Sequence, residues 1–432
     1  MSEPEESAHQ RLAEDIVSCL LNAYFGKRAP DRMVEEVLYR AVPLGGLERN
    51  YTVRLFLKPT ALIAPAIMLR GKGPSYLASH SMNNIMEMLR KFVYRHFPII
   101  WKEMITEEFD GSLYEIVSDD CRLIFIDALK TSTIFKPRME YIAFPITPLI
   151  VNEDFECENF SLIDVHSLTN GNADSLCKEY LGDKEVGGWL ITKAASVEAA
   201  KRERCVVLGA LALAMDQQHR HVFTLRKVVS GFLRFPTPHS ISTNTSNPHT
   251  PPIGSPITIG NLDHTWLNKL PVILSSSSPL SKRQGKALEY YYRAWFMDES
   301  DRCFLLFMAL DAIFGQGRGG FAVGMKSGIR ETLNENIDEK RLDALLGIRN
   351  TMLHGGAPHL FASSKYLKYA QQYSSDPSTD TQLLAAKCLR RHIFGDDFRC
   401  QDNPDAEVLQ RAKAQGLIPS ETNFNSIVSE WP

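Results

Sequence analysis

Residues 341–356 (RLDALLGIRNTMLHGG) narrow the possible folds of this chain more than any other stretch. Their apolar side chains recur at the i, i+3, i+4, i+7 spacing of a helix that buries one face. Arg349 falls within this apolar stripe, where it needs a buried anion or an interface partner, because an unpaired buried charge is very costly. The Gly355–Gly356 pair is typical of a left-handed C-cap. The stretch therefore predicts a helix that begins near Asp338 and ends at these glycines.

A second stripe on the same predicted helix bears polar side chains and a glycine. Asn350 and His354 are one turn apart, so we expect their side chains to meet, and Gly347 on this stripe permits another backbone to approach. On the preceding predicted helix, Asp311 lies among aromatic residues. An ion pair between Asp311 and Arg349 across the helix interface would satisfy both charges.

The chain from residue 280 onward has the pattern of an all-helical domain. Ser281 is a candidate N-cap for the first helix, whose apolar positions include Leu288 and Trp295. A Gly-rich loop, GQGRGGFAVG, separates two of the later segments. The predicted helices cover residues 281–296, 300–314, 325–334, 338–354 and 379–394.

The first part of the chain has a mixed texture. Helical periodicity is found at residues 7–25 and 81–107. Short β-like runs, separated by Gly, Asn, Asp and Pro, lie at residues 51–57, 122–129, 141–151, 160–165 and 187–192. We therefore predict an α+β N-terminal domain over residues 1–195.

A connecting region follows this domain. Residues 196–219 form a predicted helix with Ser196 as its N-cap, and the Pro/Ser/Thr-rich residues 236–260 are predicted to be an exposed loop or linker. The expected fold class is thus an α+β N-terminal domain (1–195), a connecting helix and linker (196–279) and an all-α C-terminal helical bundle (280–432).

The composition limits where in the cell the protein is expected to lie and which partners it is expected to bind. No segment reaches the roughly 18 uncharged apolar residues that cross a bilayer, and the acidic start, MSEPEESAHQ, is unlike a signal peptide. We therefore expect a cytoplasmic protein without a membrane partner. The net charge of −3 excludes a broadly basic protein that coats nucleic acid, but a local basic cleft remains compatible with RNA cutting.

The cysteines do not point to a metal. All eight are scattered without a CxxC pair, which favours reduced, mostly buried thiols. Cys388, His392 and Cys400 have a loosely ligand-like spacing but lack the fourth ligand that a zinc site needs. We expect neither a metal nor a cofactor.

The segment Arg349-Asn350-Thr351-Met352-Leu353-His354 resembles the R-x4-6-H motif of HEPN domains, with a polar residue directly after the Arg as in their active ribonucleases. The stretch LSKRQGKALEYYYRAWFMDESDRCFLLFMALDAIFG is similar to the Apea-like HEPN group, which shows an acidic residue in an "alEalfg"-like run. Asp311 of MALDAIFG stands at that acidic position. The resemblance covers about residues 280–395, roughly a quarter of the chain.

This resemblance implies a metal-independent endoribonuclease that works as a homodimer, with the two motifs lining one cleft. His354 would act as general base or acid on the ribose 2′-hydroxyl, Arg349 would neutralise charge on the phosphate, Asn350 would orient His354 or the phosphate, and Asp311 would support the site. The products would carry 2′,3′-cyclic phosphate and 5′-hydroxyl ends. Related proteins serve as toxins or antiviral effectors. By analogy, the N-terminal domain becomes a candidate sensor of a phage-derived or cellular trigger.

Other interpretations remain open at this point. Arg349 and Asp311 would also form a purely structural ion pair, with His354 capping the helix where its dipole favours a cation. In that case the protein is a non-catalytic, HEPN-like dimerisation or scaffold module. The Gly-rich loop gives a near miss to a phosphate-binding loop, since Met325 separates Gly324 from Lys326, which counts against a nucleotide-dependent regulator. The same region offers Arg318 and Lys326 as candidate RNA contacts.

Overall fold

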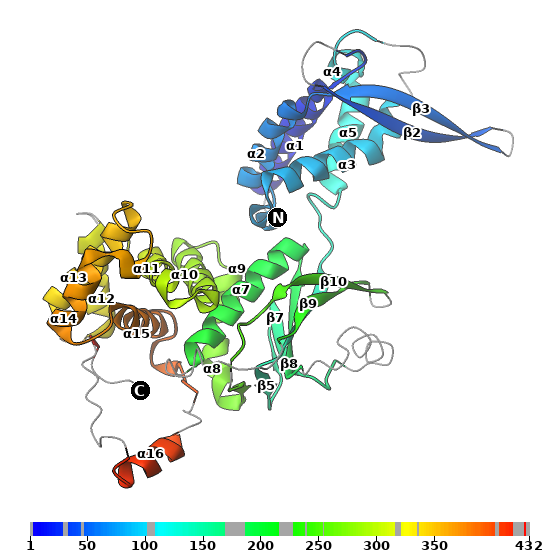
Figure 1. Ribbon diagram of the computed structural model, residues 1–432. Coiled ribbons are helices and arrows are strands. Elements are labelled where there is room, and N and C mark those ends of the chain that lie inside the picture. The colour runs from blue at the N-terminus through cyan, green and yellow to red at the C-terminus, as the bar shows by residue number, and fades with distance from the viewer. Residues whose placement is uncertain are drawn as a thin grey trace. The chain divides into compact units, whose positions relative to one another are not determined.

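The chain divides into two compact units (Figure 1). A computed structural model describes residues 3–28, 33–44, 47–101, 109–168, 186–215, 228–237, 240–253, 255–315, 321–334, 337–401, 406–417 and 427–428. The first unit comprises Met1–Met139 with Ala195–Ala199, and the second comprises Glu140–Ala194 with Ala200–Pro432. The predicted domain 1–195 therefore includes strands that belong to the second unit.

The first unit is a helical cluster joined to a long hairpin (Figure 1). Its sheet has the order β1-β3-β2, and β2 and β3 are antiparallel with Val34 opposite Leu57. Buried side chains of the helices, such as Leu20, Leu89 and Phe125, form one core. The elements are α1 (Glu3–Ala23), β1 (Tyr24–Phe25), β2 (Val34–Leu44), β3 (Leu47–Leu57), η1 (Pro59–Leu62), α2 (Ile63–Lys72), η2 (Ser75–Ser79), α3 (Met82–Trp101), α4 (Leu113–Ile116) and α5 (Asp119–Thr131).

One predicted strand of this unit is wrong, because residues 122–129 belong to the helix α5. The side chain of Ser118 accepts a hydrogen bond from the Cys121 amide and caps that helix. Phe125 and Leu129 are buried one turn apart, which is the spacing of a helix face. A short apolar run in a sequence fits both a strand and the buried face of a helix, so it does not decide between the two.

The second unit contains a six-stranded antiparallel sheet in the order β10-β9-β4-β8-β7-β6. A separate parallel pair joins β11 to β5. The strands are β4 (Glu140–Ile146), β5 (Leu149–Val151), β6 (Phe155–Glu156), β7 (Phe160–Asp164), β8 (Gly188–Ala194), β9 (Ser230–Thr237), β10 (Ser240–Pro248) and β11 (Ile257–Ile259). The predicted linker at residues 236–260 is therefore wrong. The edge strand β10 has mostly exposed Ser, Thr and Asn side chains, so it lacks the apolar alternation that marks a strand.

Helix α7 (Val197–Ala214) connects β8 to β9, and its residues from Ala200 onward belong to the second unit. Ser196 accepts a hydrogen bond from the Ala199 amide at 3.1 Å, which confirms the predicted N-cap. Gly209 lets α7 approach the following helix closely, since a Cβ there would lie 2.2 Å from the carbonyl oxygen of Leu288. Helix α7 therefore packs between the sheet and the helical region.

The rest of the second unit is helical (Figure 1), so an α+β region followed by a helical region is confirmed. The α-helices are α8 (His264–Leu267), α9 (Leu270–Ser275), α10 (Pro279–Phe296), α11 (Glu299–Phe314), α12 (Phe321–Leu333), α13 (Glu339–Leu353), α14 (Ser364–Tyr373), α15 (Pro377–Leu389) and α16 (Ala406–Ala414). Ser278, rather than the predicted Ser281, caps α10, and α14 was not predicted. None of the helices within the described ranges is long and apolar enough to cross a membrane.

Candidate functional site

Helix α13 has well-defined ends, and these ends place the motif residues. The carboxylate of Asp338 accepts hydrogen bonds from the amides of Lys340 and Arg341 at 2.9 and 3.2 Å. At the other end, Gly355 has a φ of +72°, which confirms the predicted left-handed C-cap. The last turn closes as a Schellman motif, because the Gly355 amide bonds the carbonyl of Met352 and the Gly356 amide bonds that of Thr351.

The Schellman motif fixes His354 as the C-cap residue, with φ −93° and ψ 16°. Its side chain is exposed. No hydrogen bond holds the imidazole to any residue that the structure describes. The ring is thus free to meet a ligand from solvent, while the backbone that carries it is held by two consecutive amide hydrogen bonds.

Arg349 lies in the packed stripe of α13, as predicted, with its side chain 12% exposed. Its Nη1 donates to Oδ1 of Asn350 at 2.9 Å. Its Nη2 lies 3.9 Å from Oδ2 of Asp311 on α11, so the predicted ion pair across the helix interface is present. The separation is at the long end for an ion pair.

Burial dominates the electrostatics of this pair. It raises the pKa of Asp311, although Arg349 and Lys286 pull that pKa down. It also lowers the pKa of Arg349, which the carboxylate of Asp311 only partly offsets. Each charge therefore remains more costly in the folded protein than in water. An additional anion beside Arg349, such as a phosphate, would reduce that cost.

The side chain of Asn350 contacts the arginine and not the histidine. We predicted that its side chain meets His354, but its amide oxygen accepts from Arg349 instead. Along an ideal helix, positions 349 and 354 are separated by about 7.5 Å and about 140° of rotation. Asn350 lies on the side of His354 while its oxygen reaches back to the guanidinium. One copy of α13 therefore presents its arginine and its histidine in different directions.

Lysines surround the polar stripe of α13. Lys326 on α12 forms an ion pair with Asp343, so one of the two candidate RNA contacts lies beside this helix. The other, Arg318, lies outside the described residues. The Nζ of Lys365 on α14 donates to the carbonyl of Gly347 at 3.0 Å. We expected another backbone at Gly347, but the Lys365 side chain occupies the space that a Cβ would approach, 3.5 Å from its Nζ.

A buried polar network supports the first half of α13, and sequence reasoning missed it. Arg341 donates to Oδ2 of Asp380 on α15 through Nε at 3.0 Å and Nη2 at 2.5 Å. Tyr369 on α14 donates to the same oxygen at 2.5 Å. The amide of Ile427 donates to the other carboxylate oxygen at 3.3 Å. The side chains of Arg341 and Asp380 are only 4% and 1% exposed, so their charges must be satisfied internally.

The cysteines and histidines in the part of the chain that the structure describes do not converge. Over these residues, no group of three or more His, Cys, Asp or Glu side chains is placed to hold a metal ion. Cys388 is fully buried and Cys400 is half-buried. The ring of His392 packs edge-on against Phe314, with the two ring centres 5.3 Å apart.

Comparisons with models of protein families, with curated proteins and with solved structures find no match to this chain. What the chain offers as evidence of function is therefore its own side chains. These side chains comprise an exposed histidine, a half-buried arginine and the amide between them, all on one well-capped helix.

Proposed function

We propose that this protein is a metal-independent HEPN-type endoribonuclease whose cleft is completed by a second copy of the chain. One observation carries the proposal. Arg349, Asn350 and His354 all lie in the last turns of α13, with the imidazole of His354 exposed at its C-cap and the carboxylate of Asp311 beside the half-buried guanidinium. This set combines a proton-transfer group, a cationic donor and an amide that holds the cation, all on one helix.

The proposed reaction is an internal transfer on RNA. The imidazole of His354 takes the proton of a ribose 2′-hydroxyl, and the 2′-oxygen forms a bond to the adjacent phosphorus. The bond from phosphorus to the 5′-oxygen of the next nucleotide breaks, and an imidazolium returns a proton to that oxygen. Arg349 donates hydrogen bonds to the phosphate oxygens as negative charge grows on them. The products carry a 2′,3′-cyclic phosphate and a 5′-hydroxyl.

The geometry of α13 supports a requirement for two copies. This reaction needs one group that accepts a proton and another that donates one, and each copy supplies a single His354. Within one copy, these two side chains point in directions about 140° apart on ideal helix geometry. A twofold axis beside the end of α13 would place both pairs around one phosphate. The exposed Leu367 lies on α14, which packs against α13, and provides apolar surface there.

The test is cleavage of purified tRNA and total RNA in the presence of EDTA. We expect the wild-type chain to cut, and we expect His354→Ala and Arg349→Ala each to lose at least about a hundredfold in rate. His359→Ala is the matched control, since His359 is also exposed and lies five residues further along. Cleavage by His354→Ala at the wild-type rate would reject the proposal. If cleavage requires a cellular trigger, the purified protein will not cut RNA. The toxicity of the same variants on expression in cells is therefore compared as well.

One observation favours a second candidate, a non-catalytic dimerisation or scaffold module. Asn350 and Asp311 already engage the guanidinium of Arg349, as they would in a purely structural role. For that module, Arg349→Ala would lower the melting temperature, and the wild type would neither cut RNA nor harm cells. Measuring unfolding and cleavage on the same four proteins therefore separates the two candidates.

A further inference from the structure

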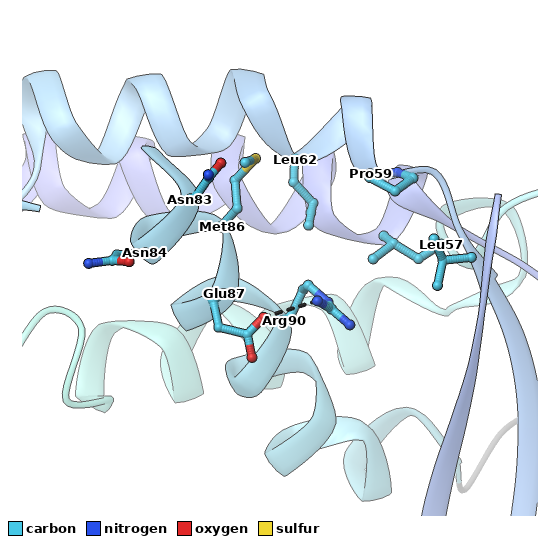
Figure 2. A pocket seen from close by; sticks show the side chains of 9 residues that line it. Leu57, Pro59, Leu62, Asn83, Asn84, Met86, Glu87 and Arg90 are labelled. Carbon is cyan, nitrogen blue, oxygen red and sulfur yellow. Dashed lines mark hydrogen bonds and ion pairs between the residues drawn. The ribbon is translucent and has the colours of Figure 1, made fainter. Parts of the chain in front are cut away.

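The first unit contains a cavity of about 440 Å³ between η1, α3 and the ends of β2 and β3 that face them (Figure 2). This volume lies within the range of sites that hold small molecules or single side chains of a partner. Its apolar lining comes from Val34, Pro59 and Met86, together with the buried core side chains Leu57 and Leu62. A polar wall comes from α3, as Figure 2 shows for Asn84, Glu87 and Arg90.

The polar wall is preformed. Nε and Nη2 of Arg90 each lie 2.8 Å from Oε1 of Glu36, and its Nη1 donates to Oε2 of Glu87 at 3.0 Å. Glu36 is itself only 12% exposed. Burial, helped by Glu36, raises the pKa of the neighbouring Tyr24 hydroxyl, which therefore stays neutral. The guanidinium is thus held in place before any ligand arrives, and the cost of ordering it on binding is small.

The charges around this wall cancel. Glu36 and Glu87 balance Arg90 and Lys91, and the Nζ of Lys91 lies 4.0 Å from Oε1 of Glu87. A ligand carboxylate would meet Glu87, and a ligand ammonium would meet Arg90, so neither gains a net attraction. A neutral amide suits both groups, because its N–H can donate to Glu87 while its carbonyl accepts from Arg90 or an asparagine amide.

We infer that this cavity binds an extended peptide segment of a partner protein, with one uncharged apolar side chain against Pro59 and Met86. The backbone amides of that segment pair with Asn84, Glu87 and Arg90. An apolar lining beside fixed polar groups of balanced charge is the combination that a neutral peptide unit requires. The inference does not depend on RNA cleavage by the second unit.

The test uses three small probes and the full-length chain, observed by saturation-transfer NMR. N-acetyl-L-leucine amide is neutral, N-acetyl-L-leucine is an anion and L-leucine amide is a cation. We expect the neutral probe to bind about tenfold more tightly than either charged one. Equal saturation of all three probes, or no saturation of the neutral one, would overturn the inference.

Variants locate the site. Asn84→Ala is expected to weaken binding of the neutral probe about threefold to tenfold. The control is Asn152→Ala, which replaces an exposed asparagine of the second unit and should leave binding unchanged. Glu87→Gln removes one carboxylate, so the anionic probe should then bind at least as well as the neutral one. A purely structural role of Glu87 would not invert this preference. Neutral-probe binding unaltered by Asn84→Ala, together with unaltered charge preference in Glu87→Gln, would place the binding elsewhere and reject the assignment.

Discussion

At the scale of single residues, burial opposes the charged forms of the side chains in the candidate site. Arg349 and Asp311 lie close enough to attract one another, yet burial shifts the pKa of each toward its neutral form. The desolvation of a buried ion pair often exceeds the attraction between its charges, and this pair follows that pattern. In the proposed reaction, a phosphate beside Arg349 would offset the remaining cost of the buried guanidinium.

Asp311→Asn should therefore separate stability from activity. Because the pKa of Asp311 is raised above its ordinary 3.8, its contribution to stability is present at low pH and is lost as the pH rises through the folded-state pKa. We expect Asn, which resembles the protonated acid, to leave the free energy of unfolding near pH 7 unchanged within about 0.5 kcal/mol or slightly raised. RNA cleavage should fall, because Arg349 loses an orienting partner. Urea unfolding and cleavage, measured on the same samples, check both; a large loss of stability with full activity would contradict this account.

Glu203 on α7 gives a second pH effect, away from the site. Burial raises the pKa of Glu203 from 4.5 to about 8, against a smaller opposing effect of Arg202. The folded chain therefore holds a proton that the unfolded chain releases, and stability falls as the pH rises from 4.5 to about 8. Glu203→Gln should remove this loss. At pH 9 its free energy of unfolding should therefore exceed that of the wild type by an amount on the order of a few kcal/mol. Urea unfolding at pH 6 and pH 9 measures it, with the exposed Glu158→Gln as control; parallel changes in both variants would refute the assignment.

At the scale of helices and strands, α13 is supported from behind by the Arg341–Asp380 pair. That pair joins α13 to α15, and Tyr369 adds α14 to the same carboxylate. Arg341 lies about two turns before Arg349 on the same helix. The network therefore sets the position of the whole helix, and with it the candidate site at the far end.

Removing one partner of this network should be far worse than removing both. Asp380→Ala leaves a buried guanidinium without its counter-ion, and we expect a loss of about 3–5 kcal/mol in the free energy of unfolding. The double variant Arg341→Met with Asp380→Leu replaces both charges by apolar groups and should recover most of that loss. Guanidinium denaturation of the single and double variants measures the difference. Additive losses in the double variant would show that charge pairing is not the source of the effect.

The helix that carries the motif was predictable from sequence because its signals are local. Asp338 begins it, the glycines after His354 end it, and its periodicity identified the arginine in the packed face. The pairing with Asp311 followed from the need to satisfy a buried charge. The hydrogen bond of Asn350 to Arg349 did not follow, since a helix brings the amide near two neighbours and only side-chain rotamers choose between them.

Other elements were not predictable, for physical reasons that differ. Residues 122–129 form an apolar run that suits a strand and a buried helix face equally. Strand β10 is mostly polar and depends on backbone pairing with β9. The Arg341–Asp380 network joins residues 39 positions apart, and no local pattern connects such distant partners. The cavity beside Arg90 likewise depends on how strands and helices meet.

At the scale of the whole molecule, the proposed cleft needs two chains. If each copy contributes an arginine and a histidine to one cleft, a wild-type chain paired with an Arg349→Ala/His354→Ala chain lacks half of that cleft. Co-expression with two different affinity tags allows the mixed dimer to be isolated, and roughly half of all dimers should be mixed if pairing is random. We expect mixed dimers to cut RNA far more slowly than half the rate of wild-type dimers. Mixed dimers that keep about half of the wild-type rate would show that each copy works alone.

The most direct test of the central claim is the chemistry of the cut ends. RNA cleaved by the wild-type protein in EDTA should carry 2′,3′-cyclic phosphate at its new 3′ ends and hydroxyl groups at its new 5′ ends, as resolved by mass spectrometry of short fragments. The same RNA incubated with His354→Ala should remain intact. Ends with a 3′-hydroxyl and a 5′-phosphate, or identical cyclic-phosphate products from His354→Ala, would contradict catalysis by this imidazole.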